Sequence, residues 1–306
     1  MTWIDDLSLA QQLAEAADSI SARYYAAGSV PTRAKADGSP VTDADREVER
    51  VLRARLASDR PQDAFLGEEF GGGDSDGRRW GGRRWVVDPV DGTANFAAGR
   101  PEWSTLIALE TGGEGVTGTS EGVTGTSEVV TGMISAPALR RRWWATRASG
   151  AWTAKSTESG MGRPEALAVS GTATLAECTA AYWPAWDWVP ASRLAAAKAL
   201  LGVCLGGGPL SDWPGVCQGA MLVASGEADV FLHLTAEPWD LAAAVPVVEE
   251  AGGRFSDFAG GRSITTGAGL FTNGRVHEEV LDLLAPVLHI PGILPDASQS
   301  PTEVER

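Results

Sequence analysis

The sequence predicts a mixed α/β fold. Short apolar runs that suit strands alternate with longer amphipathic segments, and the alternation is clearest in the second half of the chain. The 306 residues are long for one core and short for two independent ones, so we expect one multilayered unit that can divide into two lobes. A hydrophobic content of 43% and a charged content of 21% are typical of an ordinary globular protein.

The first half opens with two predicted helices. Residues 5–26 carry leucine, alanine and isoleucine at helical spacing and are followed by Gly28 and Pro31, which stop a helix. Residues 43–57 repeat this pattern, with valines and leucines on one face. The apolar stretches DAFLG, WVVDPV and STLIAL then predict strands, each entering a turn or loop.

A seven-residue segment, EGVTGTS, occurs twice in succession, at 114–120 and 121–127. The units are too short and too few for a repeat fold. We expect a duplication at the tip of a hairpin, because loop tips tolerate insertions; a flap over an active site is the alternative. Strand pairing should resume at VVTGMISAP, with RRRWWATRASGAW as the next hairpin.

The second half predicts strands between helices. The predicted helices cover 192–202, the region around 216–224, 238–251 and 277–288, and the predicted strands are CTAAYW, ADVFLHL, GRFSDF and GLFTNG. The tail, residues 289–306, is rich in proline and serine and is predicted to be disordered.

The bulk charge and the cysteines exclude several classes of function. A formal charge of −15 disfavours binding to nucleic acid or to anionic membranes. The three cysteines form no C-x-x-C pair, so we expect buried thiols rather than a disulfide framework or a zinc site. The acidic N-terminus does not resemble a secretory signal, and no apolar run is long enough to span a membrane. We therefore expect a cytoplasmic protein.

The stretch VVDPVDGTANF places Asp88 and Asp91 three residues apart, after an apolar strand. A turn between them would bring both carboxylates to one side, where their charges repel unless a proton or a metal ion intervenes. Oxygen ligands suit Mg²⁺. If a helix starts at Gly92 and Thr93, its free N–H groups form a cradle for phosphate. A purely structural Asx-turn is the alternative.

Other acidic residues are candidates for the same site. Glu68 and Glu69 follow a predicted strand, Asp240 opens an alanine-rich helix, and Asp45 lies near the start of the second helix. For the two helical residues, the plain alternative is a favourable charge at a helix N-terminus.

Four segments together resemble the inositol monophosphatase superfamily of metal-dependent phosphatases. They are PVTDAD, GEE, WVVDPVDGTANF and PWDLAAAVPVVEEAGG, in the family's order and over nearly the whole chain. Within it, FLGEEFGG, SAPALRRRWWATRASGAW and LFTNG resemble the actinobacterial histidinol-phosphate phosphatases. The resemblance implies a layered αβαβα sandwich. An α+β lobe, 1–155, would carry most metal ligands, and an α/β lobe, 156–288, would carry the remaining ligand and substrate specificity.

The resemblance also implies roles for individual residues. The metal ligands would be Glu68, Asp88, the backbone carbonyl of Val90, Asp91 and Asp240. Together they would bind two or three Mg²⁺ ions, and lithium would inhibit. Asp45 and Glu69 would support these ligands without touching an ion. Thr93, paired with Asp45, would polarise the attacking water, and the N–H groups of Gly92 and Thr93 would hold phosphate. Many relatives are homodimers, which implies a homodimer here.

The substrate is a small phosphate ester by the same resemblance. The substrate-contacting positions would be Asp212, Trp213, His233 and Glu237. A glutamate often stands seven residues before the last metal-binding aspartate in the family. Here His233 takes that place, so a partner for an ammonium group is missing unless Glu237 substitutes.

Several substrates remain open. Twelve tryptophans suit either a core or a pocket for a flat ring. Histidinol phosphate ranks first. A nucleoside monophosphate or a sugar phosphate from a specialised pathway ranks second, and inositol phosphate third. A scaffold without catalysis would have a broken ligand set or lack Thr93, and the sequence shows neither departure.

Overall fold

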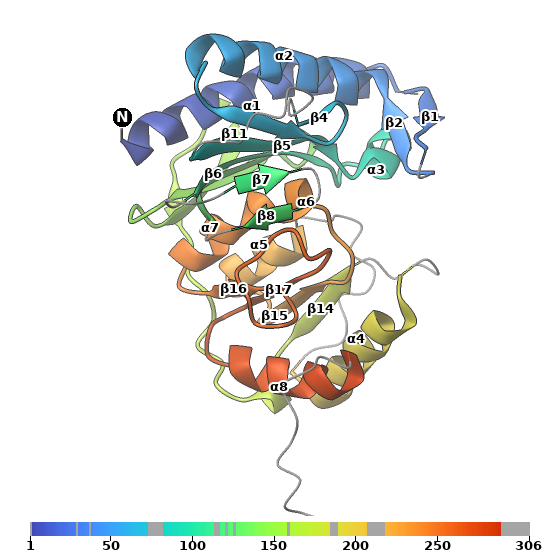
Figure 1. The fold of residues 1–306 in the computed structure, drawn as a ribbon, viewed down its shortest axis with the longest axis vertical. Helices are drawn as coiled ribbons and strands as arrows, with labels where there is room; N and C mark the ends of the chain where they lie inside the picture. The colour runs from blue at the N-terminus through green and yellow to red at the C-terminus, as the bar shows by residue number, and fades with distance from the viewer. Residues whose placement is uncertain are drawn as a thin grey trace, which may run out of the picture.

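The structure, a computed structural model, consists of five alternating layers of helices and sheets. Helices α1 (Trp3–Ala26) and α2 (Asp43–Asp59) cover the outer face of a large sheet. A middle layer of helices separates this sheet from a smaller one, and α4 (Ala191–Val203) and α8 (His277–Leu288) close the far side (Figure 1). The layered αβαβα sandwich that the resemblance implies is thus confirmed. The described residues are 2–28, 30–36, 38–72, 82–112, 117–119, 122–124, 127–157, 160–183, 189–206 and 218–288.

The large sheet is almost entirely antiparallel. Its order is β12-β11-β10-β9-β6-β5-β3-β4, with β13 paired to β11, and only β3 and β5 run parallel. The strands are β3 (Ala64–Gly67), β4 (Gly71–Gly72), β5 (Arg83–Asp91), β6 (Ser104–Gly112), β9 (Ser127–Ala136), β10 (Arg141–Thr146), β11 (Ala151–Thr157), β12 (Gly160–Met161) and β13 (Glu165–Ala166). Two small hairpins stand apart: β1 (Thr32–Ala34) with β2 (Pro40–Thr42), and β7 (Thr117–Thr119) with β8 (Gly122–Thr124).

The small sheet has the order β14-β15-β17-β16, with one parallel pair, β14 and β15. Its strands are β14 (Ala180–Trp183), β15 (Val230–His233), β16 (Arg254–Ser256) and β17 (Gly269–Thr272). Side chains of β15 alternate between two cores: Val230 and Leu232 face α4 and α8, whereas Phe231 packs with the middle helices.

The middle layer consists of α5 (Gln218–Ala224), α6 (Pro238–Ala242) and α7 (Ala244–Glu250). The prediction of one continuous helix from residue 238 is therefore wrong, since the helix is interrupted at Ala243. Pro246 has no N–H and cannot bond to the carbonyl of Ala242, which explains the interruption. Small residues allow these helices to approach the large sheet: a Cβ on Gly132 of β9 would overlap the carbonyl oxygen of Ala243.

Local chemistry explains where the long helices begin. Thr2 and Asp5 form a reciprocal capping box at α1, and Thr42 and Asp45 form one at α2. Among the described residues, no helix has the length and apolar character needed to cross a membrane.

The predicted hairpin at the EGVTGTS duplication is confirmed where the structure describes it. β7 comes from the first copy and β8 from the second, and they pair antiparallel with Thr117 opposite Thr124. The remaining residues of the two copies, apart from Ser127, lie outside the described residues, as does the tail 289–306. The division into lobes at residue 155 stays a prediction.

Candidate metal centre

A bulge at the end of β5 creates the centre of the site. Asp88 pairs with Leu106 of β6, and Asp91 pairs with Ser104. Between these two pairs β5 advances by three positions and β6 by only two, so β5 contains one extra residue. Residues three apart in a regular strand face opposite sides, and the extra residue turns both carboxylates to the same side. The hydroxyl of Thr105 donates to the carbonyl of Pro89 at 2.8 Å and holds the bulge.

The Asx-type contact is also present. The N–H of Val90 donates to Oδ1 of Asp88 at 2.9 Å. The structural and the functional interpretations of this loop therefore do not exclude each other, because a carboxylate has a second oxygen for another partner.

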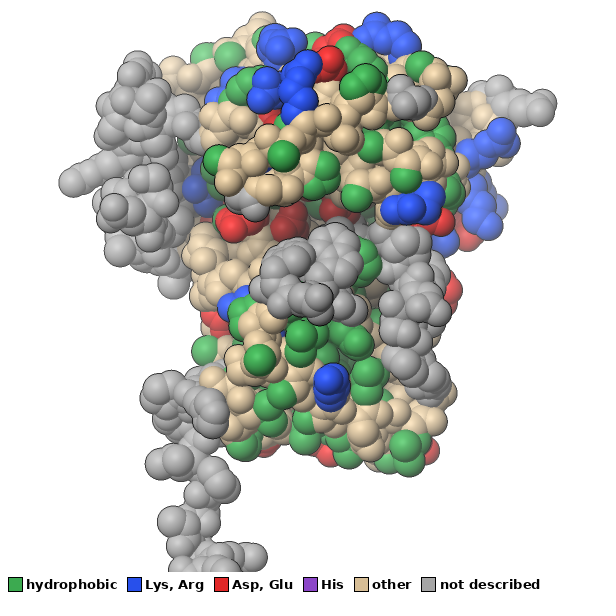
Figure 2. Space-filling view, turned by 90° about the vertical axis from the view of Figure 1, so that its right-hand side faces the viewer, with side chains coloured by type: hydrophobic (Ala, Val, Ile, Leu, Met, Phe, Trp, Pro, Cys, Tyr) green, Lys and Arg blue, Asp and Glu red, His purple; other side chains and the backbone are tan. Residues whose placement is uncertain are grey.

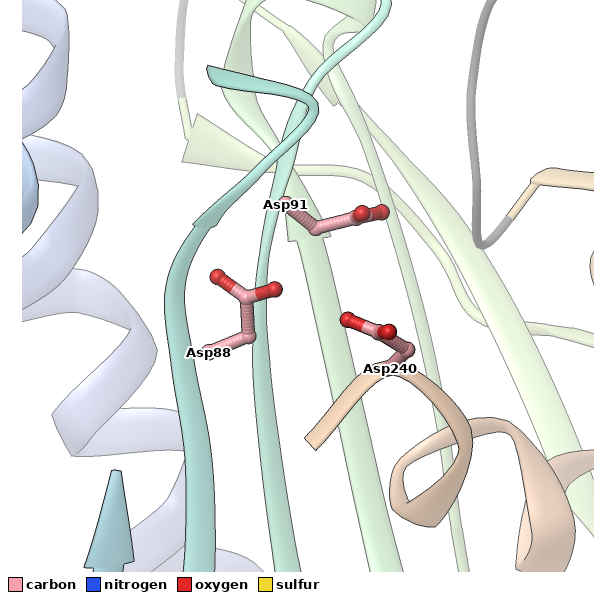
Figure 3. A group of neighbouring side chains, drawn as sticks. All are labelled: Asp88, Asp91 and Asp240. Carbon is pink, nitrogen blue, oxygen red and sulfur yellow. The ribbon is translucent and has the colours of Figure 1, made fainter. Parts of the chain in front are cut away.

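Asp240 joins these two carboxylates from the first turn of α6 (Figure 3). Each of Asp88, Asp91 and Asp240 offers an oxygen, and these oxygens lie within 4.8 Å of one another. Asp240 Oδ2 accepts the N–H of Glu237 at 2.8 Å, so the helix cap also orients the carboxylate. Figure 2 shows acidic side chains in a hollow between the upper and lower parts of the molecule.

Burial and like charge make this cluster a poor place for three ionised carboxylates. Asp88 is 2% exposed and Asp91 is 5% exposed. Burial, with the nearby charges of Glu68, Asp91 and Asp240, raises the pKa of Asp88 well above its usual value. Burial and the charge of Asp91 likewise raise the pKa of Asp240. A donor set made only of oxygen, with excess negative charge, fits a hard divalent cation.

Lys35 is a component of the site that the sequence analysis missed. Its Nζ lies 2.7 Å from Oε1 of Glu68 and 2.6 Å from Oε1 of Glu69. Burial opposes the charge of Lys35, but the two carboxylates outweigh it and raise its pKa. Burial raises the pKa of Glu69 to about 7, with Lys35 opposing that shift. The available signal was a single lysine in KADGSPVTDAD, shortly before the acidic motif.

Thr93 and Asp45 lie in contact, in the arrangement that the resemblance implies. The Thr93 hydroxyl is 3.1 Å from Oδ1 of Asp45 and 3.1 Å from the carbonyl oxygen of Val90. The other carboxylate oxygen of Asp45 accepts the N–H of Thr42 at 2.9 Å. Burial raises the pKa of Asp45. Asp45 therefore holds the Thr93 hydroxyl in place from the first turn of α2.

The chain turns at Gly92 into a short helix, α3 (Thr93–Ala97). Gly92 has φ = +83°, a conformation that side chains disfavour, and a Cβ there would lie 2.9 Å from the carbonyl oxygen of Glu102. Behind the turn, Phe96 and Trp103 pack edge to face at 4.8 Å between ring centroids. The loop is thus backed by a buried aromatic pair.

The four residues predicted to contact the substrate lie in different surroundings, and two of them are not described by the structure. His233 ends β15 with 3% of its surface exposed, and neither ring nitrogen has a hydrogen-bond partner among the described residues. Burial lowers its pKa to about 3, with a smaller opposing contribution from the nearby backbone of Thr235. Glu237 forms a capping box with Asp240 at α6. Asp212 and Trp213 lie outside the described residues.

This fold and the acidic cluster define a phosphomonoesterase of the inositol monophosphatase family. The family model "Inositol monophosphatase family" matches residues 5–289, and the chain belongs to this family, whose members are metal-dependent. The chain is similar to the histidinol-phosphatases of Mycobacterium tuberculosis and Streptomyces coelicolor. It is 38% identical to the former over 280 residues, covering 92% of this chain and 98% of that protein. It is 37% identical to the latter over 283 residues, covering 92% and 97%. The solved structure of Thermotoga maritima IMPase superimposes with a TM-score of 0.71 at 25% identity, covering 93% of this chain and 98% of that one.

Proposed function

We propose that the protein is a Mg²⁺-dependent phosphatase that releases inorganic phosphate from histidinol phosphate. The observation that carries the metal-dependent part is the meeting of Asp88, Asp91 and Asp240 from distant parts of the chain. The substrate is supported by the two histidinol-phosphatases with which the chain shares 37% and 38% identity.

Each residue has a distinct task in this proposal. Asp88, Asp91 and Asp240, with Glu68 and the carbonyl of Val90, would hold two or three Mg²⁺ ions. Bound Mg²⁺ would neutralise the phosphate dianion and lower the pKa of a coordinated water. The N–H groups of Gly92 and Thr93 would bind phosphate oxygens. Lithium inhibition and a homodimer are further expectations from the family.

Thr93 and Asp45 would act on the attacking water. The Thr93 hydroxyl would orient the water in line with the bond to the leaving oxygen, while Asp45 holds the hydroxyl. The water oxygen would bond to phosphorus as the phosphorus–alkoxide bond breaks. Of the two protons of this water, one would end on the alkoxide, which leaves as the alcohol, and the other would stay on the released phosphate. No covalent enzyme intermediate is required, so neither a histidine nor a cysteine is needed as a nucleophile.

A second substrate class is favoured by His233. A buried imidazole with a pKa of about 3 is uncharged at neutral pH and cannot pair with an ammonium group as a carboxylate would. A neutral imidazole has one ring nitrogen that donates a hydrogen bond and one that accepts. This suits an uncharged leaving group, such as that of a nucleoside monophosphate or a sugar phosphate; inositol phosphate ranks third.

A panel of phosphate esters assayed for phosphate release with and without Mg²⁺ tests the proposal. We expect histidinol phosphate to have the highest kcat/KM. His233→Glu should raise kcat/KM for histidinol phosphate if its amine faces this position, whereas the neutral His233→Gln should not. A higher kcat/KM for a nucleotide or sugar phosphate would favour the second class. Metal binding without any phosphate release would indicate a scaffold instead.

A further inference from the structure

Glu49 is a buried carboxylate near the site to which the proposed function gives no task. It lies in α2 with no exposed surface. Its Oε2 accepts the backbone N–H of Glu69 at 2.6 Å, and its Oε1 accepts that of Phe70 at 3.1 Å. Both bonds are charge-assisted and shielded from water, so they are stronger than ordinary backbone contacts.

These two bonds fix the turn that carries Glu68. On one side of the turn, the N–H of Glu68 donates to the carbonyl of Val87 in β5 at 3.3 Å. On the other side, Arg53 donates to the carbonyl of Gly71 at 2.5 Å and lies 2.9 Å from Oε1 of Glu49. The turn is therefore tied to β5 at one end and to α2 at the other.

The close approach of Glu49 depends on a missing side chain. A Cβ on Gly67 would overlap the Glu49 carboxylate. Because Gly67 has no side chain, the Glu49 carboxylate of α2 can lie directly against the turn.

One face of α2 serves two parts of the site. Asp45 and Glu49 are four residues apart and so lie on the same side of the helix. Asp45 holds the Thr93 hydroxyl, and Glu49 holds the backbone of the turn that presents Glu68. A shift of α2 would move both groups together.

We propose that Glu49 is a positioning residue that sets the divalent-cation affinity of the site by fixing the Glu68–Glu69 turn. It touches neither an ion nor the substrate, and it acts through the orientation of Glu68. Groups that orient metal ligands typically contribute about 10–100-fold to affinity or activity. The inference rests on the proposed metal site.

Glu49→Gln tests this proposal with little change in shape. The glutamine keeps one acceptor oxygen but turns an NH₂ group toward one of the two backbone N–H donors. Mn²⁺ affinity without substrate, measured by electron paramagnetic resonance, should fall about 10–100-fold. The Mg²⁺ concentration for half-maximal phosphate release should rise by a similar factor, with kcat at saturating Mg²⁺ less affected. Glu49→Asp, which keeps the charge but withdraws it by one methylene, should lie between glutamine and wild type.

Glu47→Gln is the matched control, because Glu47 lies on the same helix and pairs with Arg23 at the surface. It should leave Mn²⁺ affinity unchanged. Wild-type Mn²⁺ affinity in the folded Glu49 variants overturns the inference, even if their melting temperatures fall. An absence of Mg²⁺-dependent phosphate release from the wild-type protein would refute the proposed function instead, and the Mn²⁺ measurement would still judge Glu49.

Discussion

Replacing Asp240 with asparagine should stabilise the metal-free protein and abolish its stabilisation by Mg²⁺. Asparagine keeps an acceptor for the Glu237 N–H, so the substitution removes charge with little change in packing. The cluster oxygens lie within 4.8 Å of one another. At an effective dielectric constant of about 20, two unit charges about 5 Å apart repel by roughly 3 kcal/mol. Protons taken up by the cluster relieve part of this repulsion, so we expect a gain of about 1–3 kcal/mol.

Thermal unfolding in EDTA and in Mg²⁺ measures both effects. In EDTA, Asp240→Asn should melt a few degrees above wild type, since about 1 kcal/mol corresponds to roughly 2–4 °C in a domain of 150–250 residues. In Mg²⁺ at about 100 times its Kd the wild type should gain about 2.7 kcal/mol and the variant none, so the difference between them should shrink or reverse.

Asp282→Asn, on the exposed side of α8, is the control and should shift neither curve. A variant that is less stable than wild type in EDTA, or that gains as much from Mg²⁺, would refute the reasoning about the cluster.

Three further outcomes follow from the geometry. Thr93→Ala should lower kcat more than Mg²⁺ affinity, because the task proposed for the hydroxyl is to orient water; equal losses in steady-state assays would contradict that role. Ala148 has φ = +59°, so Ala148→Gly should raise the free energy of unfolding in urea by about 1 kcal/mol, whereas the buried Ala151→Gly should lower it. Burial lowers the pKa of His233 to about 3 and of His277 to about 4. Between pH 6.5 and 4 the unfolded chain protonates each of these histidines and the folded chain does not, so each lowers the free energy of unfolding by up to about 1.4 kcal/mol per pH unit as the pH falls. The carboxylates with raised pKa values act in the opposite direction. His277→Asn should therefore make the protein lose less stability on acidification than wild type, and an unchanged pH dependence would contradict this role of His277.

Local sequence chemistry predicted the parts of the molecule that depend on neighbours in the chain. The helix predicted from residue 43 begins at Asp43, and the turn after Asp88 places Asp91 on the same side, as predicted. These features are set within a few residues, so spacing and residue type suffice. The layered arrangement was expected from the family resemblance, since periodicity alone does not assign sheet order.

The sequence did not predict the contacts between residues that are far apart in the chain. The ion pairs of Lys35 with Glu68 and Glu69 cross a gap of more than thirty residues. The contact of Glu49 with the same turn has no spacing signature either. The break at Ala243 was missed because the alanine-rich pattern of the segment continues through it, while Pro246 acts on a carbonyl one turn earlier.

The position of Asp240 late in the sequence has a consequence for the order in which the site is assembled during synthesis and folding. Asp88 and Asp91 leave the ribosome long before Asp240 does, and α6 must then pack onto the far side of a sheet made from earlier residues. The three carboxylates meet only after the middle layer has docked. A nascent or truncated chain that ends before Asp240 consequently lacks the complete cluster of three carboxylates.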